Sequence, residues 1–326
     1  MKYQEILNQA NKSLKLKNIK KFSLDSELLL SKILKKKREE VLINLNENIG
    51  KKDEEKFNIQ LFRRLKKEPV SYILEYKNFW KYKFFVNKSV LIPRPETEHL
   101  VEEALKIIPL SKSYNILDVG TGSGCIIVSI IKERVKCRAD ALDLSNNAIK
   151  VAKINAKLHH LENKIKFINI DIDKYNSNKY DLILSNPPYI NDIDLSRLDD
   201  DIKIYEPKEA LSGGLNGYKE IKKIIEKSSK ILKINGKLIF EIGNAQKEYT
   251  KRLLKNNGMY INKIIKDLSG KDRCIVSTKL NKWITTKIIT KETGLSQMAT
   301  EILEKEILMV IKSTEILMEV QILREE

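Results

Sequence analysis

Apolar residues in the first quarter of the chain recur every three or four positions, which is the spacing of amphipathic helices. The clearest runs cover residues 23–34, where Ser23 can cap the helix start, and residues 56–67. A shorter helical run over residues 70–74 follows a proline, which is well tolerated at a helix start. Because no run here alternates as a strand does, we expect residues 1–76 to form a small helical bundle.

The hydrophobic pattern then changes to one typical of strands. Aromatic and β-branched residues dominate positions 79–86 and 89–92, and the polar pair Asn87-Lys88 separates the two runs. Apolar runs on either side of a short polar turn are typical of a β-hairpin. We therefore expect residues 77–92 to form a hairpin that links the helical bundle to the rest of the chain.

From residue 93 to residue 280, short apolar runs alternate with amphipathic segments. Pro93-Arg94-Pro95 opens this part as a stiff turn. The expected strands cover residues 115–119, 139–144, 165–170, 180–185 and 236–242, followed by two later strand-like runs, and the expected helices cover residues 96–108, 146–159, 218–232 and 245–256, with one more ending at residue 133. Continuous apolar strands separated by helices indicate an α/β domain with a buried, mostly parallel sheet.

The composition is that of a folded protein that works in a reducing compartment. Hydrophobic residues make up 42% of the 326 positions, yet no apolar run reaches the roughly 20 residues of a membrane span. The first 20 residues lack the apolar core of a signal peptide. Cys125, Cys137 and Cys274 stand far apart, without metal-ligand spacing. We expect a cytoplasmic protein with free thiols, no metal site and no membrane partner.

The formal charge of +17 raises the question of a nucleic-acid partner. The excess is overwhelmingly lysine, and isoleucine and asparagine are abundant throughout, which indicates a coding bias. A surface that grips phosphates or guanine edges in bidentate fashion would contain more arginine. We therefore expect no stable nucleic-acid partner.

Residues 281–326 differ in composition from the rest of the chain. The tripeptide Glu-Ile-Leu recurs at Glu301, Glu306 and Glu315, which makes a low-complexity, helix-favouring tail. A partner-binding helix is one interpretation, and an appended helix without a function of its own is the favoured one.

A glycine-rich loop follows the first strand of the α/β part. Asp118-Val119-Gly120-Thr121-Gly122-Ser123-Gly124 leads from that strand into a helix, and its glycines allow a ligand to approach the backbone closely. A lone GxGxG pattern is weak, since dinucleotide enzymes share it. The loop alone therefore predicts a nucleotide-like cofactor without deciding which one.

Acidic residues at three successive strand ends favour S-adenosyl-L-methionine as the cofactor. Asp118 can accept from the methionine ammonium, Asp143 can hold the ribose hydroxyls, and Asp171 lies near the expected adenine amine. For Asp171 a helix-capping role is about equally favoured, and Asp173 competes for the cofactor role. The expected cofactor-binding residues are Asp118, Gly120, Thr121, Gly122, Ser123, Gly124, Asp143, Asp171 and Asn186.

The tetrapeptide Asn186-Pro187-Pro188-Tyr189 directly follows the fourth strand, at the edge where open α/β sheets bind ligands. An amide or exocyclic amine is a poor nucleophile because its lone pair is delocalised. The Asn186 oxygen and the Pro187 carbonyl can accept its two N–H bonds, and Tyr189 can wall the substrate. We expect Asn186, Pro187 and Tyr189 to be catalytic and all four residues to bind the substrate, with no general base.

The chain resembles the HemK/PrmC family of protein-(glutamine-N5) methyltransferases. The resemblance rests on residues 25–30, 68–74 with 79–80, 91–98, 118–124, 186–190, 206–207, 210–211, 213–214 and 217, and 241–243 with 246. It implies a Rossmann-like S-adenosylmethionine-dependent methyltransferase domain over residues 93–280, behind a substrate-recognition domain over residues 1–76. Glu75 departs from the family, which usually has glycine there, and no aromatic residue for adenine follows Asp171.

The resemblance also implies the substrate, which is the glutamine of the Gly-Gly-Gln motif in class 1 peptide chain release factors. The helical domain is implied to contact the release factor away from the catalytic loop. Two alternatives are an N-methyltransferase of an exocyclic amino group in rRNA, tRNA or DNA, and a non-catalytic cofactor-binding protein. The absence of a recognisable RNA-binding signature disfavours the first, and the intact residues 186–189 disfavour the second.

Overall fold

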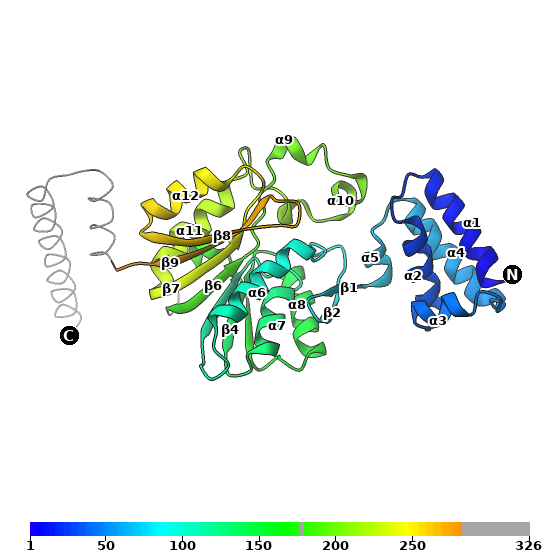
Figure 1. Cartoon of the computed structure of the whole chain (residues 1–326), viewed down its shortest axis with the longest axis horizontal. Coiled ribbons are helices and arrows are strands. Elements are labelled where there is room, and N and C mark those ends of the chain that lie inside the picture. The colour runs from blue at the N-terminus through cyan, green and yellow to red at the C-terminus, as the bar shows by residue number, and fades with distance from the viewer. Residues whose placement is uncertain (177–178, 282–326) are drawn as a thin grey trace, which may run out of the picture.

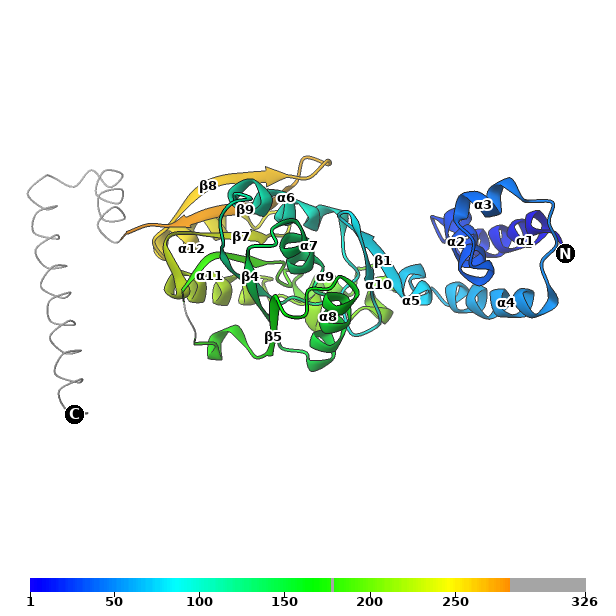
Figure 2. The same ribbon diagram turned by 90° about the horizontal axis from the view of Figure 1, so that it is seen from below.

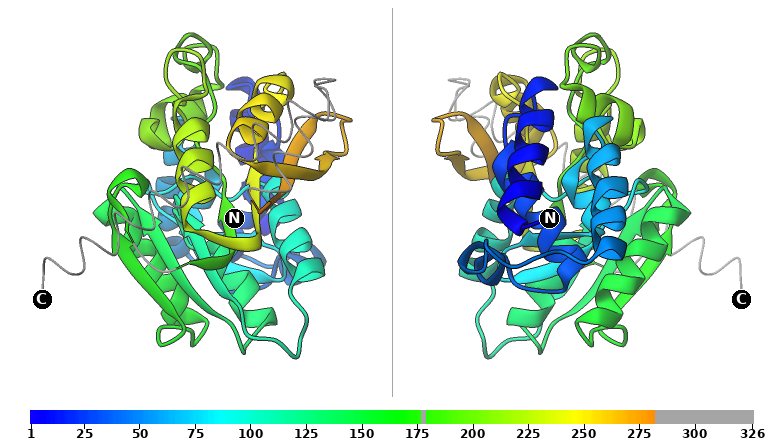
Figure 3. Two further views of the ribbon diagram at one scale, coloured as in Figure 1. Left: turned by 90° about the vertical axis from the view of Figure 1, so that its left-hand side faces the viewer. Right: turned by 90° about the vertical axis from the view of Figure 1, so that its right-hand side faces the viewer.

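The computed structural model describes residues 1–176 and 179–281, which form a helical domain and an α/β domain arranged end to end (Figure 1). Figure 2 shows the helical domain standing clear of the sheet and joined to it through one short helix and a hairpin. Figure 3 looks along the long axis from both ends: the helical domain lies behind the α/β domain in the left panel and in front of it in the right panel. The predicted tail falls, apart from Asn281, outside the described residues.

The helical domain confirms the predicted small bundle. Its helices are α1 (Tyr3–Leu16), α2 (Phe22–Leu34), α3 (Arg38–Ile43), α4 (Lys51–Leu65) and α5 (Val70–Leu74). Leu29, Phe57 and Ile73 are among the side chains that meet in its core. The capping prediction for Ser23 is wrong: α2 begins one residue earlier, and the Ser23 hydroxyl donates to Glu27 from within the first turn.

A buried ion pair ties two of these helices together. The Arg64 Nε on α4 donates to the Asp25 Oδ2 on α2 at 2.7 Å, and both side chains are less than a tenth exposed. Arg64 also donates to the backbone carbonyl of Glu68. Removing one partner would leave the other charge buried without compensation, so this pair helps to specify how α2 and α4 pack.

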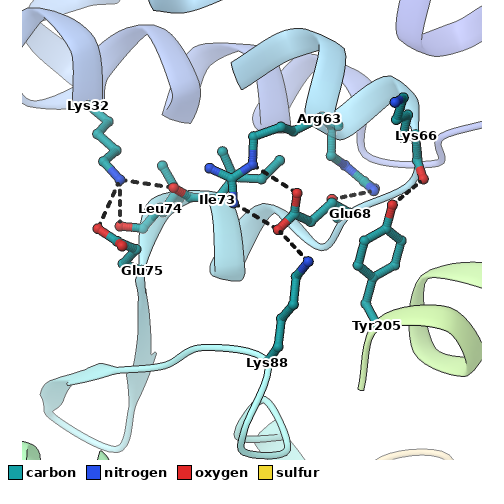
Figure 4. Close-up of polar contacts among 10 residues, drawn as sticks. Lys32, Arg63, Lys66, Glu68, Ile73, Leu74, Glu75, Lys88 and Tyr205 are labelled. Carbon is teal, nitrogen blue, oxygen red and sulfur yellow. Dashed lines mark hydrogen bonds and ion pairs between the residues drawn. The ribbon is translucent and has the colours of Figure 1, made fainter. Parts of the chain in front are cut away.

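The end of α5 explains why glycine is usual at position 75. Glu75 closes the helix in the left-handed conformation, with φ of 63°, which glycine adopts without steric cost. Here Lys32 supports the strained turn (Figure 4): its Nζ donates to the carbonyls of Ile73 and Leu74 and lies 3.6 Å from the Glu75 carboxylate. The turn is therefore kept despite the departure from glycine.

The hairpin is present, but its predicted register is wrong. Strand β1 (Tyr76–Phe79) pairs antiparallel with β2 (Tyr82–Phe85), and the turn lies at Trp80, which has a φ of 55°. The apolar run over residues 89–92 forms no strand. Its Val90 and Ile92 are buried against Val151 of the α/β domain, so tertiary packing accounts for the hydrophobic pattern that predicted a strand.

A seven-stranded sheet, in the order β5-β4-β3-β6-β7-β9-β8, forms the α/β domain. Its strands are β3 (Asn115–Val119), β4 (Arg138–Asp143), β5 (Ile165–Asn169), β6 (Tyr180–Ser185), β7 (Leu232–Glu241), β8 (Met259–Lys266) and β9 (Asp272–Lys279). The first five pair in parallel, and β9 and β8 extend the sheet antiparallel beyond β7. This confirms the predicted mostly parallel sheet and the Rossmann-like class.

Helices cover both faces of the sheet (Figure 1). They are α6 (Glu98–Ile107), α7 (Cys125–Glu133) and α8 (Asn146–Leu158), and on the other face α11 (Lys219–Ile231) and α12 (Lys247–Asn256). Leu100 and Ile127 belong to one hydrophobic core and Ile221 and Leu254 to the other. Two short helices, α9 (Asp192–Leu195) and α10 (Asp200–Tyr205), were not predicted. Within the described ranges, no helix combines the length and apolar character that crossing a membrane requires.

Candidate active site

The glycine loop leaves β3 at the point where the sheet connections reverse direction, between β4 and β6. Gly120, Gly122 and Gly124 all have positive φ, between 55° and 78°. A Cβ added to Gly120 or Gly122 would meet nothing within 4 Å, whereas one on Gly124 would come within 3.3 Å of Ala152 on α8. The first two glycines therefore border open space where a ligand fits, and the third allows the loop to pack on α8.

Asp118 fits the role of holding a cationic group. It is fully buried at the end of β3, and its Oδ2 accepts a hydrogen bond of 2.6 Å from the Thr121 hydroxyl. Its Oδ1 is buried without a hydrogen-bond partner in the described part of the chain. Burial raises the pKa of this carboxyl to about 7. An orphaned buried carboxylate oxygen beside the open loop is suited to the ammonium of a bound amino acid group.

Asp143 and Asp171 follow the ends of the next two strands, as predicted. The Asp143 carboxylate accepts from the backbone N–H of Gly122 and of Ser145, both at 2.8 Å. These bonds tie the β4 end to the glycine loop, and each oxygen retains a second lone pair for a hydroxyl. Asp171 caps a short 3-10 helix by accepting from the Asp173 N–H and lies 3.5 Å from Lys223. The capping role is thus observed, and the cofactor role stays a prediction.

Ser123 is buried in the loop and is held from α8. Its backbone carbonyl accepts from the Nδ2 of Asn155 at 2.8 Å, and the same amide pairs with both backbone groups of Phe85 in the hairpin. Asn155 is fully buried, so it fastens the hairpin to the glycine loop. We did not single it out from the sequence, because an asparagine within an amphipathic helix gives no signal of such a link.

The predicted tetrapeptide lies directly after β6, next to the glycine loop. Asn186 donates from Nδ2 to the Thr97 hydroxyl oxygen at 3.0 Å, and the Thr97 hydroxyl donates to the Glu241 Oε2 at 2.7 Å. The Tyr189 hydroxyl donates to the other oxygen of Glu241 at 3.0 Å. Burial and the neighbouring Glu241 raise the pKa of Tyr189 well above its usual value, so its hydroxyl stays protonated.

Gln246 and Gly243 support the backbone and the ring of Tyr189. Gln246 donates from Nε2 to the carbonyls of Tyr189 and Gly217, and its Oε1 accepts from the Gly243 N–H. A Cβ on Gly243 would lie 2.9 Å from the Tyr189 ring. From the sequence, Gln246 and Gly243 entered only through the family resemblance. The signal available in the sequence itself was a charged residue, Glu241, directly after the apolar run 238–240.

Two family models match this chain. A methyltransferase domain matches residues 110–306, and the PrmC N-terminal domain matches residues 5–74. The chain is 36% identical over 282 residues to the release factor glutamine methyltransferase of Clostridium acetobutylicum, and the match covers 86% of this chain and 99% of that protein. The chain belongs to the release factor glutamine methyltransferase family.

The family has longer relatives. The chain is 35% identical over 325 residues to the bifunctional methyltransferase of Rickettsia typhi, and the match covers 93% of this chain. It spans 62% of that relative's length. Among solved structures, the ribosomal protein L11 methylase of Lactobacillus delbrueckii subsp. bulgaricus superposes with a TM-score of 0.46 and 18% identity, covering 64% of this chain and 91% of that one.

The Pro-Arg-Pro turn that this chain shares with the family is anchored by Glu206. The Arg94 Nη2 donates to the Glu206 Oε1 at 2.6 Å, and the Ile92 N–H donates to its other oxygen at 3.3 Å. Glu206 is buried directly after α10, and that burial raises its pKa while Arg94 opposes the rise. Arg94 and Glu206 therefore hold the turn that places Thr97 at the site.

A cavity of about 470 Å³ opens beside the tetrapeptide in this family member. Its lining includes Tyr189, Tyr218, Gly243, Ala245 and Arg273. The strand order β5-β4-β3-β6 brings Asp171, Asp143, the glycine loop and Asn186 along one edge of the sheet, in that sequence. The predicted cofactor residues thus lie on one side of Asn186, and the cavity beside Tyr189 lies on the other.

Proposed function

We propose that this chain transfers a methyl group from S-adenosyl-L-methionine to the side-chain amide nitrogen of the glutamine in the Gly-Gly-Gln motif of class 1 peptide chain release factors, in the cytoplasm. The proposal draws on relatives named release factor glutamine methyltransferase, one of which is matched over 99% of its length. The observation that carries it is the position of Asn186 directly after β6, the strand next to the one that leads into the glycine loop, with a cavity lined by Tyr189 three residues further on.

The cofactor, when bound, supplies an electrophilic methyl carbon. The free oxygen of Asp118 would accept from its ammonium group, the Asp143 carboxylate would accept from ribose hydroxyls, and the backbone of Gly120 and Gly122 would let it approach closely. Asp171 is proposed to reach the adenine amine while it caps its 3-10 helix. These residues hold the donor on one side of Asn186.

The chain's own contribution to the reaction is to present the amide nitrogen. The Asn186 Oδ1 accepts one N–H of the substrate and the Pro187 carbonyl accepts the other, which directs the nitrogen lone pair at the methyl carbon. Pro187 suits this role because its φ is restricted and it carries no competing N–H. Tyr189 and Pro188 wall the amide. The methylated nitrogen then loses a proton to water.

A labelling experiment tests this function. The full chain is incubated with an intact bacterial class 1 release factor and methyl-labelled S-adenosyl-L-methionine, and the product is mapped by mass spectrometry. We expect one added methyl group on the Gly-Gly-Gln glutamine, with the rate reduced about 100-fold in Asn186→Ala because the nucleophile is no longer aligned. An unmodified release factor, or stoichiometric transfer to rRNA, tRNA or DNA instead, would contradict the proposal.

A further inference from the structure

A continuous chain of hydrogen bonds lies behind the site and connects three elements that are distant in sequence. It comprises Asn186, Thr97, Glu241 and Tyr189, which we call the Asn186 network. Thr97 ends the short 3-10 helix Pro95–Thr97, and Glu241 ends β7. Both Thr97 and Glu241 are 2% exposed, so water cannot take the place of either partner.

The chemistry of the network fixes the direction of each hydrogen bond. Glu241 accepts on both of its carboxyl oxygens, from the Thr97 hydroxyl at Oε2 and from the Tyr189 hydroxyl at Oε1, so it takes the single hydroxyl hydrogen of Thr97. The Thr97 oxygen is then left to accept, and its partner must be the Nδ2 of Asn186 rather than the Oδ1. The orientation of the Asn186 amide therefore follows from the hydrogen bond that Glu241 accepts from Thr97.

This orientation matters because the two ends of an asparagine amide have opposite hydrogen-bonding character. With Nδ2 committed to Thr97, the Oδ1 of Asn186 faces away from the network, and among the described residues it accepts no hydrogen bond. An amide flipped by 180° would present N–H groups to a substrate amide that also offers N–H groups. Two donors facing each other cannot bond, so the flipped state cannot hold the substrate nitrogen.

We propose that Thr97 and Glu241 are positioning residues, which lock the Asn186 side chain with its oxygen toward the methyl-accepting nitrogen. This inference rests on the proposed function and deepens it. Tyr189 is held by the same carboxylate through its hydroxyl. Glu241 thus aligns the acceptor that grips the substrate and the ring that walls it, without contacting either reactant.

Three variants of the full chain test the proposal with the release factor as substrate. Thr97→Val keeps the shape of the side chain and removes the hydroxyl, Thr97→Ser restores the hydroxyl, and Thr250→Val is the matched control. The Thr250 hydroxyl is buried on α12 without a hydrogen-bond partner in the described structure, so the same change there breaks no bond.

We expect Thr97→Val to lower kcat about 100-fold while changing KM for the release factor less than about threefold, because alignment is lost and binding area is kept. Thr97→Ser should recover kcat to within about fivefold of wild type, and Thr250→Val should match wild type. Wild-type kcat in Thr97→Val, or a Thr97→Ser variant as impaired as Thr97→Val, would overturn the proposal.

A readout that needs no activity is the side-chain NH2 signal of Asn186 in ¹⁵N-labelled protein, assigned by its disappearance in Asn186→Asp. It should exchange slowly with solvent in wild type and Thr97→Ser, and fast in Thr97→Val. Unchanged exchange in Thr97→Val would count against the network. If wild type leaves the release factor unmodified while this signal behaves as expected, the proposed substrate fails and the positioning role stands.

Discussion

At the scale of single residues, Asp118 shows how a binding site is maintained at the expense of stability. Its carboxyl is fully buried, has one hydrogen-bond donor in Thr121, and has one oxygen without a partner in the described chain. Burial favours the neutral form and raises the pKa to about 7. A bound cation would relieve this cost, so the residue is better suited to the liganded protein than to the free one.

This gives a pH-dependent prediction for the ligand-free protein. At pH values well below its ordinary pKa of 3.8, the carboxyl is protonated in both the folded and the unfolded chain, and it does not change the free energy of unfolding with pH. As the pH rises to about 7, the unfolded chain has lost the proton while the folded chain retains it, so stability falls.

We expect Asp118→Asn to gain stability over wild type by on the order of a few kcal/mol between pH 4 and pH 8. The measurement is the free energy of unfolding of both proteins across this range. Asp53→Asn, the same substitution at a partly exposed position on α4, is the control. A constant difference between Asp118→Asn and wild type would refute the assignment of the raised pKa.

At the scale of elements, the loop after β6 depends on close backbone contacts that glycine permits. Gly217 is buried with a φ of 73°, and a Cβ there would lie 2.5 Å from the Tyr189 carbonyl and 2.9 Å from the Gln246 Nε2. Because Gln246 holds that same carbonyl, a side chain at position 217 would push the tetrapeptide off its support. The geometry of the site therefore depends on a residue that contacts no reactant.

Gly217→Ala is expected to reduce methyl transfer about 100-fold, because a displacement of the aligned groups by about 1 Å is enough for that loss. The matched control is Gly270→Ala in the β8–β9 turn, where φ is 78° and a Cβ would meet nothing within 4 Å. Both changes cost about 1–2 kcal/mol of backbone strain. The measurement is kcat of both variants relative to wild type, together with their Tm values. If both variants lose kcat to the same extent, backbone strain alone explains the loss and the contact with Tyr189 does not.

The hairpin shows where a local pattern misleads at this scale. Val90 and Ile92 carry the alternation of a strand, yet they are buried against α8 as an extended loop. The Val90 carbonyl accepts a hydrogen bond from the Tyr72 hydroxyl on α5 and not from a neighbouring strand. Burial of alternate side chains produced the pattern, and pairing between strands did not.

At the scale of the whole molecule, the two domains meet at a junction that combines polar contacts, one of which Figure 4 shows, with the packing of Tyr72 in the cluster that includes Val151. The Tyr205 hydroxyl donates to the Lys66 carbonyl, and Lys67 pairs with Asp200 on α10, both at 2.7 Å. The Lys67–Asp200 pair is about 40% exposed on both sides, and screening by solvent keeps the contribution of such a pair to stability small. The junction therefore sets the orientation of the helical domain more than the stability of the fold.

We expect the double variant Lys67→Ala/Tyr205→Phe to change Tm little and to raise KM for intact release factor several-fold, because the proposed recognition domain loses its orientation. KM for a short peptide containing Gly-Gly-Gln should not change, since only the α/β domain contacts it. Lys56→Ala, which removes an ion pair within α4, is the control. An equal rise in KM for the peptide would place the effect in the active site instead.

The sequence by itself determined the helical bundle, the alternation of strands and helices, the glycine loop and the tetrapeptide at residues 186–189. These features depend on periodicity and on residues adjacent in the chain, which a sequence displays directly. Only the tertiary structure decided that Thr97 and Glu241, 144 positions apart, meet behind Asn186. The reason is that strand order and the Arg94–Glu206 anchor bring these residues together, and neither leaves a local pattern in the chain.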